Sequence, residues 1–154
     1  MAPTDSITRA APRKNKERAQ LESRAWELLG ELFMKQRPRM MALCRELDLF
    51  PPQLMVLKAL DRPRPMSEVA GTLACDSSNL TGITDRLEER GLVRRDADPS
   101  DRRVKLLVLS KDGEKLRREV IRRMNQPPPG ATDVLSEREL RTLQGLLNKA
   151  LAEA

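Results

Sequence analysis

The sequence predicts a mainly α-helical domain with a small β-hairpin. Apolar side chains recur at helical spacing over most of the chain, and prolines, glycines and capping residues mark where the helices begin and end. One stretch, residues 92–109, instead reads as two apolar-rich strands on either side of a polar turn. With 154 residues, 39% of them apolar, the chain is long enough to bury one core without disulfides or metal ions, so we expect a single domain.

The composition excludes several classes of function. The chain has no histidine, which removes the imidazole general base and His-containing zinc sites, and only 2% aromatic residues, which disfavours RNA binding by base stacking. We therefore expect no enzymatic activity and no cofactor or metal ion. The 29 Lys and Arg residues against 23 Asp and Glu give a net charge of +6, which favours a polyanionic partner.

The cellular setting is predicted to be cytoplasmic. Cys44 and Cys75 are the only cysteines and are expected to be reduced thiols, Cys44 as an inert buried side chain. No apolar run approaches the roughly 18 residues that span a bilayer, and the N-terminus lacks a secretory apolar region.

The first third of the chain predicts a tail followed by a long helix. Residues 1–16 mix basic and small polar groups with almost no large apolar side chains, so we expect a disordered basic tail and a single folded domain over 17–154. A helical stripe begins after Glu17 and continues to about residue 48, with a kink or restart at Pro38. Its members are Leu21, Ala25, Leu28 and Leu32.

The middle of the chain predicts three shorter helices. Pro51 and Pro52 suit the first turn of the next helix, and residues 61–65 form a stiff connector. Ser67 is expected to cap a short helix, which a three-residue turn, 74–76, separates from a helix over 77–90. In that last helix the inward side chains should be Leu80, Ile83 and Leu87, with Asp76 as the cap and Gly91 as the stop.

The last third predicts a hairpin and two more helices. Strands over 92–95 and 104–109 flank a basic turn, and Ser110 caps the helix that follows. That helix carries a basic run that we expect to be a solvated face: Lys115, Arg117, Arg118, Arg122 and Arg123. After the breaker at 126–130, a capping box of Ser136 and Glu139 opens a final helix lined by Leu140, Leu143, Leu147 and Leu151.

A short helix, a tight turn, a second helix and a hairpin follow one another in the order of a winged helix-turn-helix. With Leu80, Ile83 and Leu87 inward, a polar outer face is left that fits a DNA major groove. Asn79 can bind adenine with two hydrogen bonds, and the absence of a side chain at Gly82 allows close approach to DNA. The predicted DNA-binding residues of this helix are Ser77, Ser78, Asn79, Thr81, Gly82 and Arg86. The alternative for these residues is ordinary capping and solvent exposure.

The hairpin supplies positive charge, with six basic and three acidic residues between positions 90 and 105. Arg103 is placed to enter an adjacent minor groove, and Arg102 adds charge beside it. Asp101 is expected to orient Arg103 or Arg102, or to meet Arg86 across the fold. These three residues, Asp101, Arg102 and Arg103, are the predicted DNA-binding residues of the hairpin; a solvated turn is the alternative.

Three stretches resemble the MarR family of bacterial transcriptional regulators: 49–60 (LFPPQLMVLKAL), 67–95 (SEVAGTLACDSSNLTGITDRLEERGLVRR) and 98–113 (DPSDRRVKLLVLSKDG). The resemblance implies a homodimer, a pseudo-palindromic double-stranded operator, and a repressor often released by a small phenolic or aromatic molecule. It divides the domain into dimerisation helices, 17–48 and 110–154, and a winged helix-turn-helix lobe, 52–109. The sequence departs from the family at Gly82, where members frequently have a basic residue, and over 17–32, where peroxide sensors have a cysteine.

An effector pocket is predicted from soft and aromatic side chains, with core packing as the alternative. The candidates are Trp26, Phe33, Met40, Cys44 and Met55. Two other functions stay open at this point. One is a DNA-binding regulator without small-molecule input, and the other is a winged-helix module that binds protein rather than DNA.

Overall fold

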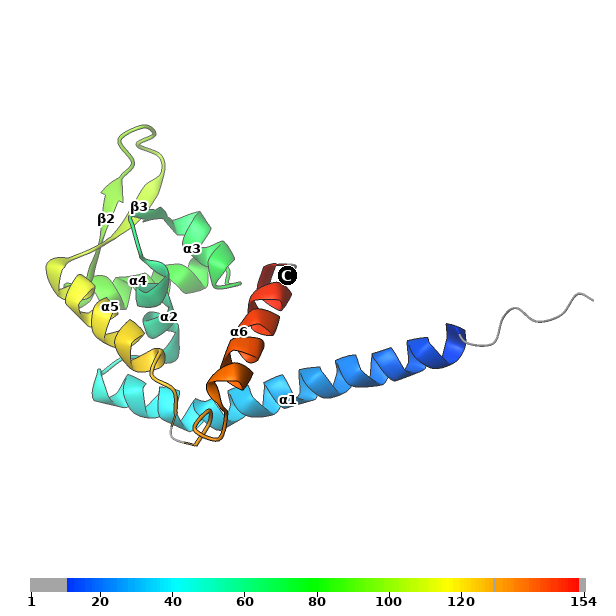
Figure 1. Cartoon of the computed structure of the whole chain (residues 1–154). Helices are drawn as coiled ribbons and strands as arrows, with labels where there is room; N and C mark the ends of the chain where they lie inside the picture. The colour runs from blue at the N-terminus through cyan, green and yellow to red at the C-terminus, as the bar shows by residue number, and fades with distance from the viewer. Residues whose placement is uncertain (1–10, 129, 153–154) are drawn as a thin grey trace, which may run out of the picture. The chain divides into compact units, whose positions relative to one another are not determined.

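The computed structural model describes residues 11–128 and 130–152, which form six helices and one three-stranded antiparallel sheet (Figure 1). The chain divides into two compact units, Met1–Arg39 and Met40–Ala154. The boundary between them falls within the first helix, one residue after Pro38. The mainly helical class predicted from the sequence is confirmed. No helix among the described residues is both long enough and apolar enough to cross a membrane.

The first unit contains most of helix α1 (Ala11–Glu46). Residues 1–10 of the expected tail lie outside the described residues, and residues 11–16 are helical, which corrects the prediction there. Pro12 stands in the first turn, where its missing N–H costs nothing, and basic residues with good helix propensity follow it. The helix also runs on through Pro38, so it does not restart at that residue. All side chains from 15 to 35 are exposed within the chain.

The core of the second unit lies where helix α2 (Pro51–Ala59) packs among the later elements. Pro51 and Pro52 open α2 as predicted, and the Gln53 side chain accepts a hydrogen bond from the Phe50 N–H at 2.8 Å. The core side chains that are fully buried lie between residues 54 and 120: Leu54, Leu57, Leu60, Val56, Val69, Leu80, Leu87, Leu107 and Val120.

The helix-turn-helix consists of α3 (Met66–Thr72) and α4 (Ser77–Glu89). The Asp76 carboxylate caps α4 by accepting from the Asn79 N–H at 2.7 Å, and Gly91 has the positive φ of +67° that ends the helix. Leu80 and Leu87 are fully buried and Ile83 is partly buried, as predicted. Ser67 does not cap α3, because the helix already begins at Met66 and Pro65 precedes it without a side-chain cap.

The sheet contains one strand more than the predicted hairpin. β2 (Val93–Ala97) and β3 (Lys105–Leu109) form the hairpin, and β1 (Arg64–Pro65) pairs with the other edge of β3. Strand β1 comes from the predicted stiff connector, 61–65, and its proline is tolerated because β1 is an edge strand. We call residues 93–109 the wing; its turn extends away from the helices of this unit (Figure 1).

Helices α5 (Lys111–Met124) and α6 (Glu137–Ala152) complete the second unit. The start of α5 packs directly against the base of the wing, because a Cβ built on Gly113 would lie 2.0 Å from the carbonyl oxygen of Leu92, the residue before β2, and 3.2 Å from the Leu109 side chain. The predicted capping box opens α6, with the Ser136 N–H donating to Glu139 at 2.8 Å. None of the residues of α6 is buried within the chain.

Candidate nucleic-acid interface

The outer face of α4 is polar, exposed and held in place from beneath. Ser77, Ser78, Asn79, Thr81, Gly82 and Arg86 are all exposed, as the sequence predicted. Leu80 and Leu87 fix the opposite face in the core. Thr84 is also fully buried, which the sequence did not predict; its hydroxyl donates to the Leu80 carbonyl at 3.0 Å and so needs no partner from the core.

The polar side chains of this face differ in how many hydrogen-bond donors and acceptors they leave available. The Ser78 hydroxyl donates to Asp76 at 2.6 Å and the Thr81 hydroxyl donates to the Ser77 carbonyl at 2.8 Å, so both retain only acceptor capacity. Within the described part of the chain, the Asn79 carboxamide makes no hydrogen bond, so its donors and acceptor are all available. A free carboxamide at the start of an exposed helix matches the two-point recognition of an adenine edge.

A groove of about 490 Å³ runs beside this face, between the start of α2 and the outer side of α4. Phe50 and Pro51 line one side, and Asn79, Gly82 and Arg86 line the other. Open space surrounds Gly82, since no atom lies within 4 Å of a Cβ built there. The Arg86 guanidinium carbon lies 5.8 Å from the centroid of the Phe50 ring.

The base of the wing is fixed to α4 by one arginine. Arg95, on β2, pairs with Asp85 at 2.6 Å and with Glu88, and it also donates to the Thr84 hydroxyl. Arg94 on the same strand pairs with Asp96 at 2.9 Å. These acidic partners neutralise both cations. Arg95 therefore contributes to the orientation of the wing more than to its charge, whereas Arg94 pairs only within its own strand.

The wing tip, which we define as residues 98–104, is ordered by its own side chains. The Asp98 carboxylate accepts from the Ser100 hydroxyl and from the Ser100 N–H, and these hydrogen bonds hold the pKa of Asp98 below its usual value. The Asp101 carboxylate accepts from the Arg103 N–H at 3.0 Å. Asp101 thus holds the backbone of Arg103, whereas the expected pairing of its carboxylate with a guanidinium is not seen among the residues described.

Arg102 and Arg103 are exposed, and in the described residues neither forms an ion pair with a carboxylate. The wing therefore has two paired cations near its base, Arg94 and Arg95, and two unpaired ones at its tip, with the exposed Lys105 next to the tip at the start of β3. An unpaired, exposed guanidinium is free to bind phosphate or to enter a minor groove.

The predicted effector residues are distributed over both units. Trp26 and Phe33, 77% and 68% exposed, belong to the first unit, whereas Met40, Cys44 and Met55 belong to the second. Cys44 packs in the core, where burial raises the pKa of its thiol, and Met55 is exposed on α2. Their assignment as a pocket stays a prediction.

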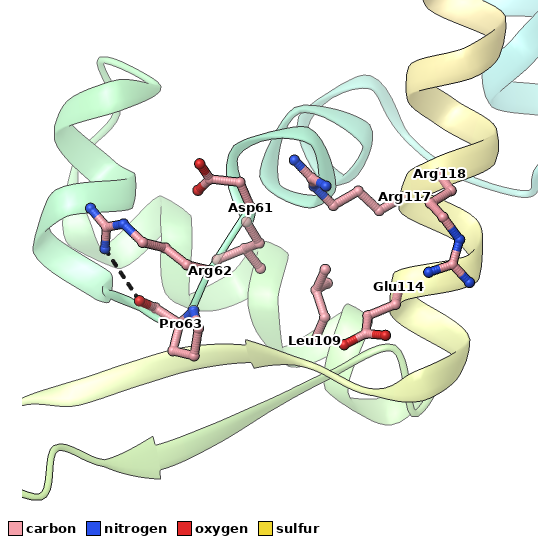
Figure 2. A pocket seen from close by; sticks show the side chains of 8 residues that line it. Asp61, Arg62, Pro63, Leu109, Glu114, Arg117 and Arg118 are labelled. Atoms are coloured by element: carbon pink, nitrogen blue, oxygen red, sulfur yellow. Dashed lines mark hydrogen bonds between the residues drawn. The ribbon is translucent and has the colours of Figure 1, made fainter.

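A second cavity, of about 300 Å³, lies between the end of α2 and the first turns of α5 (Figure 2). Leu60 and Leu109 form apolar walls, and the Arg117 side chain extends from α5 across the cavity. The Arg117 Nε is buried and has no hydrogen-bond partner. The expected solvated basic face of α5 is therefore wrong for Arg117, which is half-buried, and nothing in the basic run distinguished it from its neighbours.

Among the described residues, no group of three or more Cys, Asp or Glu side chains has the arrangement of a metal site. The fold and the exposed face of α4 and the wing define a class: winged helix-turn-helix proteins that bind double-stranded DNA. Comparison with known proteins gives the particular family.

Residues 49–105 match the model of the MarR family. Over 99 residues the chain is 35% identical to the transcriptional regulator HosA of Escherichia coli O111:H-, covering 62% of this chain and 71% of HosA. It is 34% identical to the HTH-type transcriptional repressor MdtR of Bacillus subtilis, over 56% of this chain and 57% of MdtR. The crystal structure of reduced MarR from E. coli aligns with a TM-score of 0.70 at 26% identity, covering 81% of this chain and 94% of that one.

The chain belongs to the MarR family of winged helix-turn-helix transcriptional regulators. It is a DNA-binding transcriptional regulator, and membership of the family implies dimerisation. The family comprises regulators rather than enzymes, and the alternative of a winged-helix module that binds only protein is not supported.

Proposed function

We propose that this regulator is a repressor that occupies a pseudo-palindromic operator and blocks transcription. The relative MdtR is described as a repressor, which supports this direction of control. In a homodimer, two α4 helices related by a two-fold axis enter successive major grooves about one DNA turn apart. Most of the affinity comes from phosphate neutralisation and therefore falls steeply with salt.

The observation that carries the proposal is the free polar face that α4 and the wing tip present from one lobe of the chain. Asn79 contacts a base in the major groove, and Arg103 enters the adjacent minor groove beside Arg102. Asp101 holds the Arg103 backbone in that position. The remaining contacts, to phosphates and sugars, come from Ser77, Ser78, Thr81, Gly82 and Arg86.

The dimerisation helices are proposed to be those in residues 17–48 and 110–154, with residues 52–109 as the DNA-binding lobe. The exposed apolar side chains of α1 and α6 support this division, since a chain alone does not cover them. Leu143 and Leu147, for example, remain 37% and 39% exposed.

A small phenolic or aromatic effector is proposed to release the operator, and we propose the cavity beside Arg117 as a site for it. Its apolar walls suit a ring, and a carboxylate or phenolate oxygen would satisfy the unpaired Arg117 Nε. Such a ligand acts only if it binds the DNA-incompetent arrangement more tightly than the competent one. Titrating benzoate and phenol derivatives against preformed complex of the parent and of Arg117→Met separates this from regulation without small-molecule input, in which no ligand releases DNA.

The wing carries the sharpest test of operator binding. Arg103→Ala should weaken binding to the intergenic DNA beside the regulator's own gene by about 1 to 3 kcal/mol, because an unpaired guanidinium is removed. The slope of the logarithm of the binding constant against the logarithm of the salt concentration should become shallower by about one unit. Arg94→Ala is the matched control, since Arg94 is exposed on the same wing but paired with Asp96. Equal binding by the Arg103 variant and the parent, measured by fluorescence anisotropy, would contradict the proposal.

A further inference from the structure

Phe50 is a large aromatic side chain that the core does not use. It is 64% exposed and stands directly before α2, although the chain has only two phenylalanines and one tryptophan. Its ring lies under the guanidinium of Arg86, at 5.8 Å from ring centroid to Cζ. Both residues line the 490 Å³ groove that runs along the outer face of α4.

The backbone that carries this ring is fixed on both sides. The Leu49 N–H donates to the Cys44 carbonyl at 2.8 Å, and the Leu49 side chain is buried. The Phe50 N–H donates to the Gln53 side chain, which is itself buried, and Pro51 has a restricted φ. The ring is therefore carried by a fixed backbone, and only the two side-chain torsions of Phe50 remain free.

Arg86 lies on the same side of α4 as Asn79 and Gly82, seven and four residues before it. Within the described residues, no carboxylate pairs with it. Arg95 shows the contrasting arrangement, since Asp85 and Glu88 hold its guanidinium and also neutralise it. An aromatic face orients a guanidinium through cation–π attraction while leaving its N–H donors and its charge available.

We infer that Phe50 is a positioning residue for DNA binding, which holds the Arg86 guanidinium over the groove so that it meets an operator phosphate. This inference rests on the proposed function, in which the outer face of α4 contacts DNA. Phe50 itself acts through Arg86 and does not contact the operator. The outer side of α4 around Arg86 then faces the sugar-phosphate strand beside the major groove that α4 enters.

A double-mutant cycle with Phe50→Leu and Arg86→Met tests the inference by operator binding in fluorescence anisotropy. Phe50→Leu should weaken binding about two- to fivefold, the range of an exposed cation–π contact, and Arg86→Met about fivefold or more. The double variant should bind no more weakly than Arg86→Met alone, because Phe50 has nothing left to position. Phe50→Tyr, which keeps the aromatic face, should bind like the parent.

The salt dependence of operator binding distinguishes a role in positioning Arg86 from a role in packing alone. Arg86→Met and Phe50→Leu should both flatten the dependence of binding on salt, whereas a packing defect would lower affinity with an unchanged slope. Multiplicative losses in the double variant would show that Phe50 contacts DNA itself and would overturn the inference, as would parent-like binding by Phe50→Leu. If Arg103→Ala weakens binding while Phe50→Leu does not, only this inference fails; if neither variant loses affinity, the proposed function fails as well.

Discussion

Helices α4 and α6 share two sequence features but lie in opposite environments. Each begins with a side-chain cap, Asp76 for α4 and Ser136 for α6, and each carries a leucine stripe at helical spacing. In α4 the stripe is covered by the chain itself, with Leu80 and Leu87 at 0% exposure. In α6 the stripe is uncovered, with Leu143 and Leu147 above one third exposure.

The difference separates folding from assembly. Burying a leucine side chain contributes about 1.5 to 3 kcal/mol, so the covered stripe of α4 stabilises the lobe whether or not a partner is present. The stripe of α6 contributes only when another surface covers it. Since the family dimerises, we assign that surface to a second copy of the chain.

Breaking the α6 stripe should have the largest effect. Leu143→Glu with Leu147→Glu should give a monomer that loses operator binding by more than about a hundredfold. Two negative charges cannot be buried in an apolar interface without positively charged partners. Size-exclusion chromatography with light scattering reports the mass, and circular dichroism reports the fold. Gln144→Glu with Asn148→Glu is the matched control and should stay dimeric. A double Leu variant that remains a dimer would place the interface elsewhere.

Truncating the α4 stripe should lower stability instead. Leu87→Ala removes a fully buried side chain, so the free energy of unfolding in urea should fall by about 2 to 5 kcal/mol at every protein concentration. Leu147→Ala should lower the midpoint in a concentration-dependent way, because its loss is expressed through the dimer. The comparison fails if both losses vary with protein concentration in the same manner.

The sequence predicts the stripes and caps of these two helices because they are local signals. The spacing of Leu80, Ile83 and Leu87 and the placing of Asp76 need only a helical period and an acceptor at the first turn. β1 could not be predicted in this way: Arg64 and Pro65 become a strand only by pairing with Leu107 and Leu106, far along the chain. A proline-rich connector carries no sign of that partner.

The candidate site shows the same contrast between features set by local sequence and features set by distant residues. Exposure of Asn79 and of the wing tip follows from local patterns, and the structure places both where the sequence predicts. That Arg95 anchors the wing while Arg103 stays free could not be predicted, because both are arginines in one basic stretch and only their distance from Asp85 and Glu88 distinguishes them. The Phe50–Arg86 contact joins the residue before α2 to a residue of α4, so neither period nor composition indicates it.

The caps of α4 and α6 give the smallest expected effect, a difference in acid sensitivity. The Ser78 hydroxyl and then the Asn79 N–H donate to Asp76 and lower its pKa, and the Ser136 hydroxyl and N–H lower the pKa of Glu139. A carboxyl whose folded pKa is depressed stabilises the fold above its unfolded pKa, about 3.9 for Asp and 4.3 for Glu, and that contribution is lost as the pH falls through the folded pKa.

Asp76→Asn keeps an acceptor at the α4 cap but does not titrate. Thermal unfolding of this variant should therefore depend less on pH below about pH 5 than unfolding of the parent, because α4 belongs to the lobe core. Glu139→Gln should leave that dependence unchanged in the monomeric Leu143→Glu, Leu147→Glu background, since no residue of α6 is buried within the chain. An equal flattening by both variants would mean that α6 is coupled to the folding of the lobe without a partner, and the contrast between the two helices would then be wrong.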